Sequence, residues 1–123
     1  MSHEFEKFDF YKKAHQLVLE IYACAKKLPH ADEEYGLAAD ICQTVIQIPA
    51  TIARGSAFEE DEFREHLEEA RVTIRMVDMH LMMMHRLGFI SKSECDRLLK
   101  LGDEVRQLLI QRIEGRKKKP VKA

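Results

Sequence analysis

One short segment, residues 48–63, constrains the fold of this chain more than any other. It places Pro49 inside an apolar pattern that repeats at helical spacing and continues to Ile52. A proline lacks an amide hydrogen and crowds the carbonyl four residues back, here that of Val45, which costs about 3 kcal/mol inside a regular helix. Because the pattern continues past Pro49, we expect one bent helix rather than two separate helices.

The second half of this segment predicts a helix boundary. Gly55 can adopt the left-handed conformation that ends a helix without a Cβ clash. Ser56 and Glu59 have the spacing of a capping box, in which the hydroxyl and the carboxylate each satisfy a free amide of a new helix. The acidic residues 59–62 would then occupy the first turn, where the helix dipole favours negative charge.

Apolar residues recur at steps of three and four along the rest of the chain, which predicts helices and no strands. The expected helices cover about residues 7–27, about residues 33–54 with Asp32 as the cap, and two further segments. The third helix carries an apolar stripe from Phe63 for roughly seven turns. The fourth begins at a second capping box, Ser91 with Glu94. Four helices with short connections predict an all-α, antiparallel up-down-up-down four-helix bundle whose second helix is bent by proline.

Length and composition predict a single domain at residues 1–115, followed by a basic disordered tail at 116–123. An apolar content of 46% is enough to bury a core and excludes wholesale disorder. Cys24, Cys42 and Cys95 lie far apart, which argues against a disulfide framework or a thiolate zinc site and favours the reducing cytoplasm. No segment approaches the roughly 20 apolar residues of a membrane span, so we expect no membrane anchor.

The positive charge is concentrated at the C-terminus. The cations there are Arg116, Lys117, Lys118, Lys119 and Lys122. The net charge of the whole chain is −1, so removing these five cations leaves the preceding body at about −6. Two interpretations stay open: the tail contacts RNA phosphates, or it is a disordered, solubilising end.

Residues 76–84 are apolar nearly all round the predicted third helix, and one face of a small bundle cannot bury that much surface. We therefore predict a subunit interface that contains Met76, Met79, His80 and Met83. His80 could titrate as the subunits assemble, or it could be hydrogen-bonded or exposed without such a role. The methionines are more typical of adaptable packing than of a ligand or cofactor site.

Motifs for catalysis and metal binding are missing from the sequence. His66, His80 and His85 share the third helix at intervals of fourteen and five, whereas a same-face pair needs three or four. The chain has no nucleophile elbow, P-loop or glycine-rich phosphate fingerprint. We expect no catalytic residues, no metal and no cofactor, so we predict that the protein is not an enzyme.

Several short pieces of the chain, in this order and spacing, resemble a known family. They are YKKAHQLV at residues 11–18, Ile21 with Tyr22, Leu28 with Pro29, YGL at residues 35–37, IPATIA at residues 48–53 followed by Gly55, Phe63 with Leu67 and Ala70, and LGFI at residues 87–90. Over about residues 8–112, the chain resembles the small four-helix-bundle proteins encoded in intervening sequences of bacterial 23S rRNA genes, often labelled ribosomal-type. The resemblance implies a ring-like homopentamer and kinship with accessory proteins of diversity-generating retroelements, which bind a reverse transcriptase and nucleic acid through a basic surface.

Two departures weaken the nucleic-acid role that this resemblance implies. Arg54 stands where the family usually has an acidic residue, and residues 57–62 are largely acidic where relatives are often basic. Residues 40–44 also lack the arginines that relatives carry in the second helix. Phosphate binding depends on clustered cations. The first hypothesis is therefore a non-catalytic oligomeric scaffold or adaptor with a protein partner; the alternative is an RNA-associated protein acting with rRNA or a reverse transcriptase. A third, a small hydrolytic or metal enzyme, would need a metal or a pocket with convergent polar groups.

Overall fold

The structure is a computed structural model that describes residues 3–31, 33 and 36–117, with the backbone alone for residues 116 and 117. Within these ranges the chain is all-α and contains no strand, as predicted. Its elements are the 3₁₀ helix η1 (Glu4–Lys7) and the α-helices α1 (Asp9–Ala25), α2 (Leu37–Val45), α3 (Gln47–Gly55), α4 (Glu60–Arg86) and α5 (Lys92–Lys117). Asp32, the predicted cap of the second helix, lies outside the described residues.

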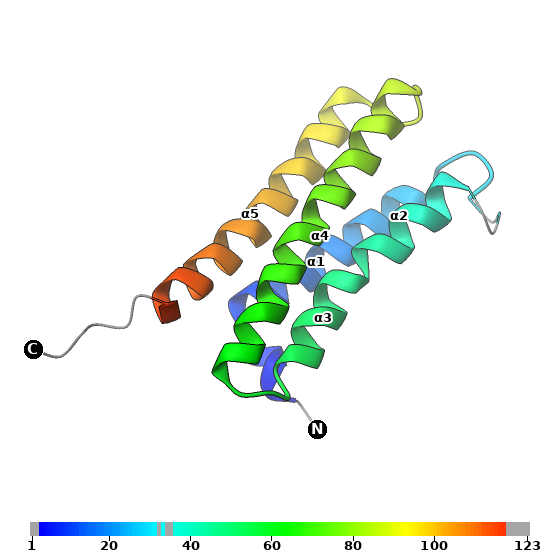
Figure 1. Cartoon of the computed structure of the whole chain (residues 1–123). Helices are drawn as coiled ribbons and strands as arrows, with labels where there is room; N and C mark the ends of the chain where they lie inside the picture. The colour runs from blue at the N-terminus through cyan, green and yellow to red at the C-terminus, as the bar shows by residue number, and fades with distance from the viewer. Residues whose placement is uncertain (1–2, 32, 34–35, 118–123) are drawn as a thin grey trace, which may run out of the picture.

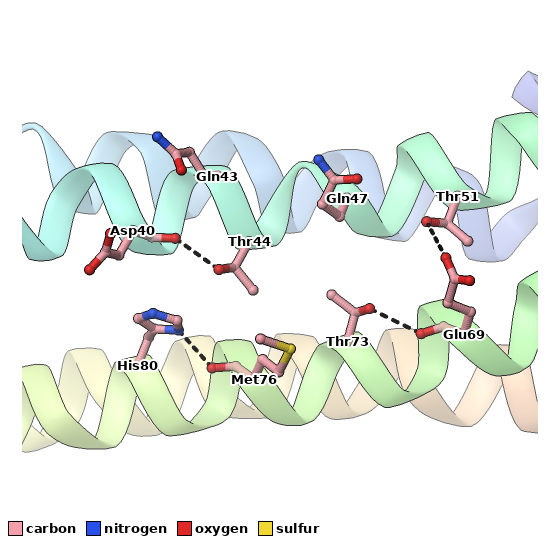
Figure 2. A pocket seen from close by; sticks show the side chains of 9 residues that line it. All are labelled: Asp40, Gln43, Thr44, Gln47, Thr51, Glu69, Thr73, Met76 and His80. Atoms are coloured by element: carbon pink, nitrogen blue, oxygen red, sulfur yellow. Dashed lines mark hydrogen bonds between the residues drawn. The ribbon is translucent and has the colours of Figure 1, made fainter. Parts of the chain in front are cut away.

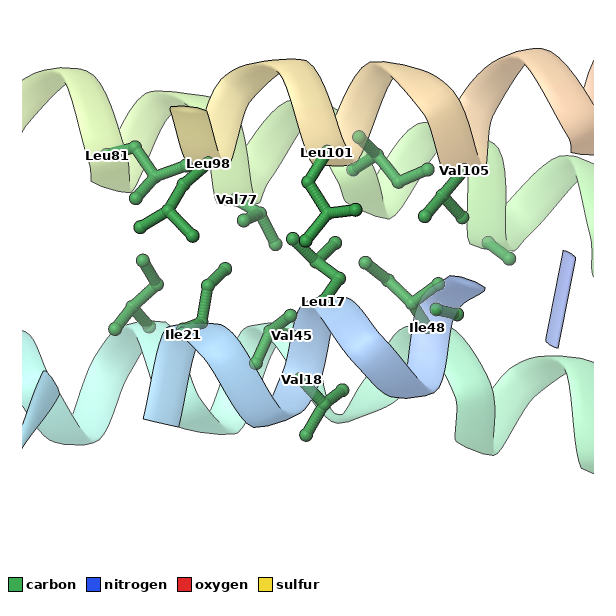
Figure 3. Close-up of a cluster of buried hydrophobic side chains, with 14 of the residues drawn as sticks. Leu17, Val18, Ile21, Val45, Ile48, Val77, Leu81, Leu98, Leu101 and Val105 are labelled. Atoms are coloured by element: carbon green, nitrogen blue, oxygen red, sulfur yellow. The ribbon is translucent and has the colours of Figure 1, made fainter. Parts of the chain in front are cut away.

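The helices form four rods around one core, because α2 and α3 follow each other along a single rod (Figure 1). Helix α1 packs against α2 and α5, and α4 packs against α3, α5 and α2. The core lies where the apolar stripes of these rods meet, as Figure 3 shows for its central part. Its largest fully buried side chains include Leu17, Ile21, Ile41, Ile48, Ile52, Leu67, Ile74, Leu81, Leu98 and Leu109.

The second rod is interrupted at Ile46, between α2 and α3, whereas the sequence predicted one helix from about residue 33. Ile46 keeps helical angles, with φ −64° and ψ −24°, and its carbonyl accepts a hydrogen bond from the Ala50 amide at 3.2 Å. Pro49 lies in the first turn of α3 and offers no amide hydrogen to the carbonyl of Val45. The interruption therefore falls one residue after the carbonyl that the proline leaves without its helical partner.

The boundary after α3 differs from the prediction. Gly55 is the last residue of α3 and is not left-handed; among the described glycines only Gly88 has a positive φ. The Ser56 hydroxyl donates to the Ala53 carbonyl at 2.7 Å, so the predicted capping box with Glu59 is wrong. Ser56 itself has helical angles and is the C-cap that follows α3, and a further turn separates it from the first residue of α4, Glu60.

Gly55 is needed for a different reason, the close approach of α3 to α4. A Cβ atom at this position would lie 2.4 Å from the Cβ of His66 and 3.1 Å from the ring of Phe63. Real Cβ atoms do not tolerate contacts as short as the first of these. The absence of a side chain therefore allows the end of α3 to pack directly on the beginning of α4.

The turn between α4 and α5 follows known capping chemistry. Gly88 has φ 82°, and its amide donates to the carbonyl of His85 at 3.0 Å while the Phe89 amide donates to that of Met84 at 2.9 Å. These two bonds make a Schellman motif. The hydroxyl of Ser91 then accepts the Glu94 amide at 3.0 Å, which is the serine half of the predicted capping box.

We expect Ser91→Ala to lower the free energy of unfolding by about 1 kcal/mol, because the Glu94 amide loses its acceptor. Urea unfolding followed by circular dichroism measures this change. Ser93→Ala is the matched control, since Ser93 is also exposed in the first turn of α5. Equal stability of the two variants would contradict the capping role.

Arg97 joins α5 to α1. Its guanidinium donates to the carboxylate of Glu20 and also to that of Glu94, the latter at 2.9 Å. The hydrogen bonds from Arg97 are the main reason why the pKa values of both carboxyl groups lie below their ordinary range. Because these pKa values are lowered by folding, the two carboxylates stabilise the fold above the unfolded pKa of about 4.3. This contribution is lost as the pH falls through the lower folded pKa values.

We expect Arg97→Met to make stability less sensitive to acid between about pH 5 and pH 3, because the folded pKa values of Glu20 and Glu94 return toward normal. Urea midpoints measured across this range give the slope of stability against pH, which should be shallower for Arg97→Met than for wild type. Lys100→Met serves as control, since Lys100 is also exposed on α5 and lies outside the exposed apolar side of α4. If stability falls equally steeply with pH in wild type and in Arg97→Met, then Arg97 does not lower the pKa values of Glu20 and Glu94.

Candidate assembly surface

Helix α4 carries apolar side chains on two sides. The buried side consists of Phe63, Leu67, Ala70, Ile74, Val77, Leu81 and Met84. A second set, Val72, Met76, Met79 and Met83, follows steps of four, three and four, and these residues are 44–59% exposed. Since each residue turns a helix by about 100°, this second set points away from the core. We call these four residues the outer stripe; it contains all three methionines predicted to lie at a subunit interface.

Charged side chains border the outer stripe. A shallow hollow of about 340 Å³ is lined by Arg75, Asp78, Met79, Met82, Met83 and Arg86. Arg75 binds the Asp78 carboxylate at 3.2 Å. Burial raises the pKa of Asp78, and the bond from Arg75 opposes this effect. An apolar centre with a charged rim is the usual anatomy of a protein–protein interface.

A polar groove of about 460 Å³ runs between α4 and the α2–α3 rod, beside the outer stripe (Figure 2). Its polar lining includes Asp40, Gln43, Thr44, Gln47, Thr51, Glu69 and Thr73. Thr51 and Arg54 both donate to Glu69, at 3.4 and 3.1 Å, so one carboxylate connects α3 to α4. Thr44 and Thr73 donate to carbonyls of their own helices instead. The groove is therefore a polar seam, held together at one end by Glu69.

His80, the fourth residue of the predicted interface, lies where this groove meets the outer stripe. Its side chain is partly buried, and its Nδ1 lies 2.8 Å from the Met76 carbonyl oxygen in the preceding turn. This geometry suits a ring that donates from Nδ1, which leaves Nε2 free of this contact. His80 is thus hydrogen-bonded within its own helix.

A second apolar surface, which the sequence analysis missed, lies between α1 and the α2–α3 rod. A hollow of about 420 Å³ there is lined in part by Tyr22 of α1 and by Ala39 and Cys42 of α2. Ile46 and Ala50 continue the same side of the rod and are exposed. We call these five residues the small-residue face. A signal was present in the sequence, because small or apolar residues recur at steps of three, four and four from residue 39 to residue 50.

The three thiols are free and contribute packing rather than reactivity. Cys24 and Cys95 are buried, and Cys42 is partly buried. Burial raises the pKa of each thiol, so all three are neutral near pH 7. The Cys95 thiol contacts the Leu81 carbonyl at 3.6 Å. Each behaves as a small apolar side chain.

The predicted basic tail begins inside a helix. Helix α5 continues to Lys117, so the backbones of Arg116 and Lys117, the first two residues of the predicted tail, are helical. Lys118, Lys119 and Lys122 lie outside the described residues. Among the residues that the structure does describe, no three His, Cys, Asp or Glu side chains gather as a metal site would require. Nor is any helix there long and apolar enough to cross a membrane.

Comparisons with known proteins agree with this architecture. No curated protein matches the chain significantly. A solved structure of a protein of unknown function from the S23 ribosomal protein family of Bacteroides thetaiotaomicron superposes with a TM-score of 0.77 at 19% identity, covering 85% of this chain and 95% of that one. At this identity the likeness concerns the fold alone. The sequence model of the 23S rRNA-intervening sequence proteins matches residues 6–111. This match spans most of the chain, which therefore belongs to the 23S rRNA-intervening sequence protein family.

Proposed function

We propose that this protein is a non-catalytic scaffold or adaptor that assembles with copies of itself and presents its outer surface to a protein partner. The observation that supports this proposal most directly is the outer stripe on α4. Burying one large apolar side chain contributes about 1.5–3 kcal/mol. Val72, Met76, Met79 and Met83 are each roughly half exposed, so covering all four contributes several kcal/mol.

The proposed assembly is a ring, as the family resemblance implies, built from bundles of up-down-up-down topology. Within each bundle we propose that Pro49 bends the second rod near Ile46, where the helix is interrupted. The three free cysteines are consistent with the reducing cytoplasm, which we propose as its location.

Light scattering after size exclusion tests the assembly. We expect a mass several times the 14.4 kDa of the chain, and a reduced mass when Met79→Glu and Met83→Glu are combined. Phe89→Glu is the matched control, because Phe89 is 42% exposed but lies in the turn after α4. A wild-type protein that stays monomeric at high micromolar concentration would refute the scaffold proposal.

A second proposal is RNA association, alone or together with a reverse transcriptase. It is supported by the five cations of residues 116–122 and by the description of the family as 23S rRNA-intervening sequence proteins. A ring would bring several such tails together, and their combined contacts would strengthen weak phosphate binding. We expect wild type to bind RNA with an affinity that falls as salt rises, and a chain without residues 116–123 to lose that dependence. An absence of RNA binding even at low salt would end this proposal.

A further inference from the structure

We propose that the polar groove between α4 and the α2–α3 rod binds an extended segment of a protein partner, and that an arginine of this segment lies between Asp40 and His80. This inference rests on the proposed adaptor function and names the chemistry of its partner. Every residue that lines the groove belongs to a single chain, so the site is complete in one subunit. The pairing of its walls, its unused hydrogen-bond acceptors and its width support the proposal.

The walls of the groove are two stripes of helix whose residues face each other in pairs (Figure 2). One stripe runs along α2 and α3 over residues 40–51, and the other runs along α4 over residues 69–80. Both advance by steps of three and four, which keeps their residues on one side of a helix. The four facing pairs are Asp40 with His80, Thr44 with Met76, Gln47 with Thr73, and Thr51 with Glu69.

The two ends of the groove differ in how their acids are used. At one end, Thr51 and Arg54 donate to the Glu69 carboxylate at 3.4 and 3.1 Å, so the walls are joined there. At the other end, the exposed Asp40 carboxylate has no ion pair and no hydrogen bond with any residue in the ranges 3–31, 33 and 36–117. The groove is therefore closed at Glu69 and open at Asp40.

The open end brings two hydrogen-bond acceptors opposite each other. The Nδ1 of His80 lies 2.8 Å from the Met76 carbonyl oxygen, so this nitrogen carries the proton and Nε2 keeps its lone pair. A carboxylate such as that of Asp40 also only accepts. Two acceptors cannot bond to each other. A ligand that donates N–H groups to both walls would join Asp40 to His80, as Thr51 joins the walls at the other end.

An arginine side chain has the donors that this end requires. The planar guanidinium carries five N–H groups, so it can give two parallel bonds to a carboxylate and still donate to a third acceptor. Its carbon stem packs well on apolar surface, which Met76 offers in the next pair along the groove with 52% of its area exposed. A lysine ammonium has three donors without this fork, so it fits the same end less well.

The width of the groove favours an extended chain over a helix. Eleven helical residues span about 16 Å, so a volume of about 460 Å³ corresponds to a mean cross-section of about 28 Å². A helix with its side chains is about 10–12 Å in diameter and has a cross-section several times larger. An extended chain is narrower, and about five of its residues cover this length. Gln43 and Gln47, which also line the groove, each offer an amide donor and an acceptor to such a backbone.

Other classes of ligand fit the groove less well. The carboxylates of Asp40 and Glu69 would repel the phosphates of a nucleic acid, and Arg54 is already bound to Glu69. A metal ion would find too few ligands, because no three His, Cys, Asp or Glu side chains gather anywhere in the described part of the chain. The charge and the acceptors of the groove therefore favour a basic peptide.

Methyl NMR of the full-length protein tests the proposal, since one of its six methionines lies in the groove. The probe is the capped pentapeptide Ser-Ser-Arg-Ser-Ser, added to protein that carries ¹³C in its methionine methyl groups. We expect the Met76 signal to shift and saturate with a dissociation constant in the millimolar range, because the probe is short. The signal of Met84, which is buried, should not move. A Met76→Leu variant assigns the signal.

Variants of the groove test which residues hold the arginine. We expect Asp40→Asn to raise the dissociation constant about tenfold, because the bonds between charged groups are lost. Glu65→Gln is the matched control, since it removes the same charge from an exposed acid of α4 that does not line the groove. His80→Phe keeps a ring but loses the acceptor, and should raise the constant about threefold. Circular dichroism checks that each variant is folded.

Changes in the probe test the chemistry of the ligand. With lysine in place of arginine, the pentapeptide should bind about threefold more weakly, because the forked pair of bonds is lost. With glutamate in that position, it should cause no saturable shift. Equal binding of the arginine and glutamate peptides, or equal affinity of wild type and Asp40→Asn for the arginine peptide, would overturn the proposal.

Two further outcomes would assign the groove to a different occupant and so contradict the inference. One is an RNA oligonucleotide that shifts the Met76 signal where the arginine peptide does not. The other is peptide binding that occurs only in a chain without residues 116–123, which would mean that the chain's own lysines occupy the groove. A protein that assembles but binds no peptide loses this inference and keeps its scaffold function. A monomeric wild type that binds the peptide loses self-assembly instead, so the two failures are distinguishable.

Discussion

A Gly55→Ala variant is expected to lower the free energy of unfolding by about 1–3 kcal/mol, although alanine is normally the better residue in a helix. The added Cβ would lie 2.4 Å from the Cβ of His66 and 2.8 Å from its Cγ. Both Cβ atoms are fixed to helical backbones, so no rotamer change relieves the contact. Helices α3 and α4 must move apart, which loosens the packing around Phe63 and Ile52.

Gly102→Ala is the matched control for this prediction. Gly102 also lies inside a helix and is buried, but a Cβ there would stay 3.6 Å from its nearest neighbours, an ordinary contact. This variant should be as stable as wild type or more stable by up to about 1 kcal/mol. Urea unfolding at one fixed protein concentration measures both, since assembly makes stability depend on concentration. A Gly55→Ala protein that gains stability would show that α3 and α4 do not pack as described.

An Ile74→Ala variant should lose about 2–5 kcal/mol of unfolding free energy, because it removes apolar atoms and leaves a cavity. Ile74 is completely buried in the middle of α4 and lies against α5 near Gly102. The long, regular helices on both sides restrict how far the core can collapse into the space. We therefore expect the loss to fall in the upper half of this range.

A graded series separates the cavity from other effects of the substitution. Ile74→Val removes one methylene and should cost about 0.5–1.5 kcal/mol. Val72→Ala, two residues earlier on the exposed side, should change the stability of the isolated subunit by less than about 0.5 kcal/mol. Chemical unfolding of all three variants under conditions that keep the chain monomeric gives the comparison. Similar losses at residues 72 and 74 would contradict the assignment of the buried side of α4.

Local patterns predicted the helices and much of the core well. The steps of three and four starting at Phe63 identified the buried side of α4, and Ser91 was correctly assigned as the cap of α5. These features depend on neighbours within one or two turns, which the sequence lists directly. The predictions around Gly55 and Ser56 were wrong because glycine and serine are compatible with several local structures. The approach of His66, eleven residues away, decides why a glycine is required at residue 55.

The two candidate surfaces also differ in whether the sequence predicted them. The outer stripe was predictable, because all four of its residues belong to one helix. That helix carries more apolar side chains than one buried side can cover. The small-residue face was not predicted, because Tyr22 and Ala39 come from different rods and meet only after folding. Short side chains also give a weak signal, since alanine is common on any helix surface.

The sequence by itself determined where the helices run, which side of each is apolar, and that α4 has more apolar surface than a single bundle can cover. Periodic burial is a property of consecutive residues, so it can be derived without coordinates. Only the tertiary structure decided how residues 48–63 are used: Pro49 lies in the first turn of α3, Gly55 permits a helix contact, and Ser56 bonds backward to Ala53. These roles depend on distances between rods, which no local pattern contains.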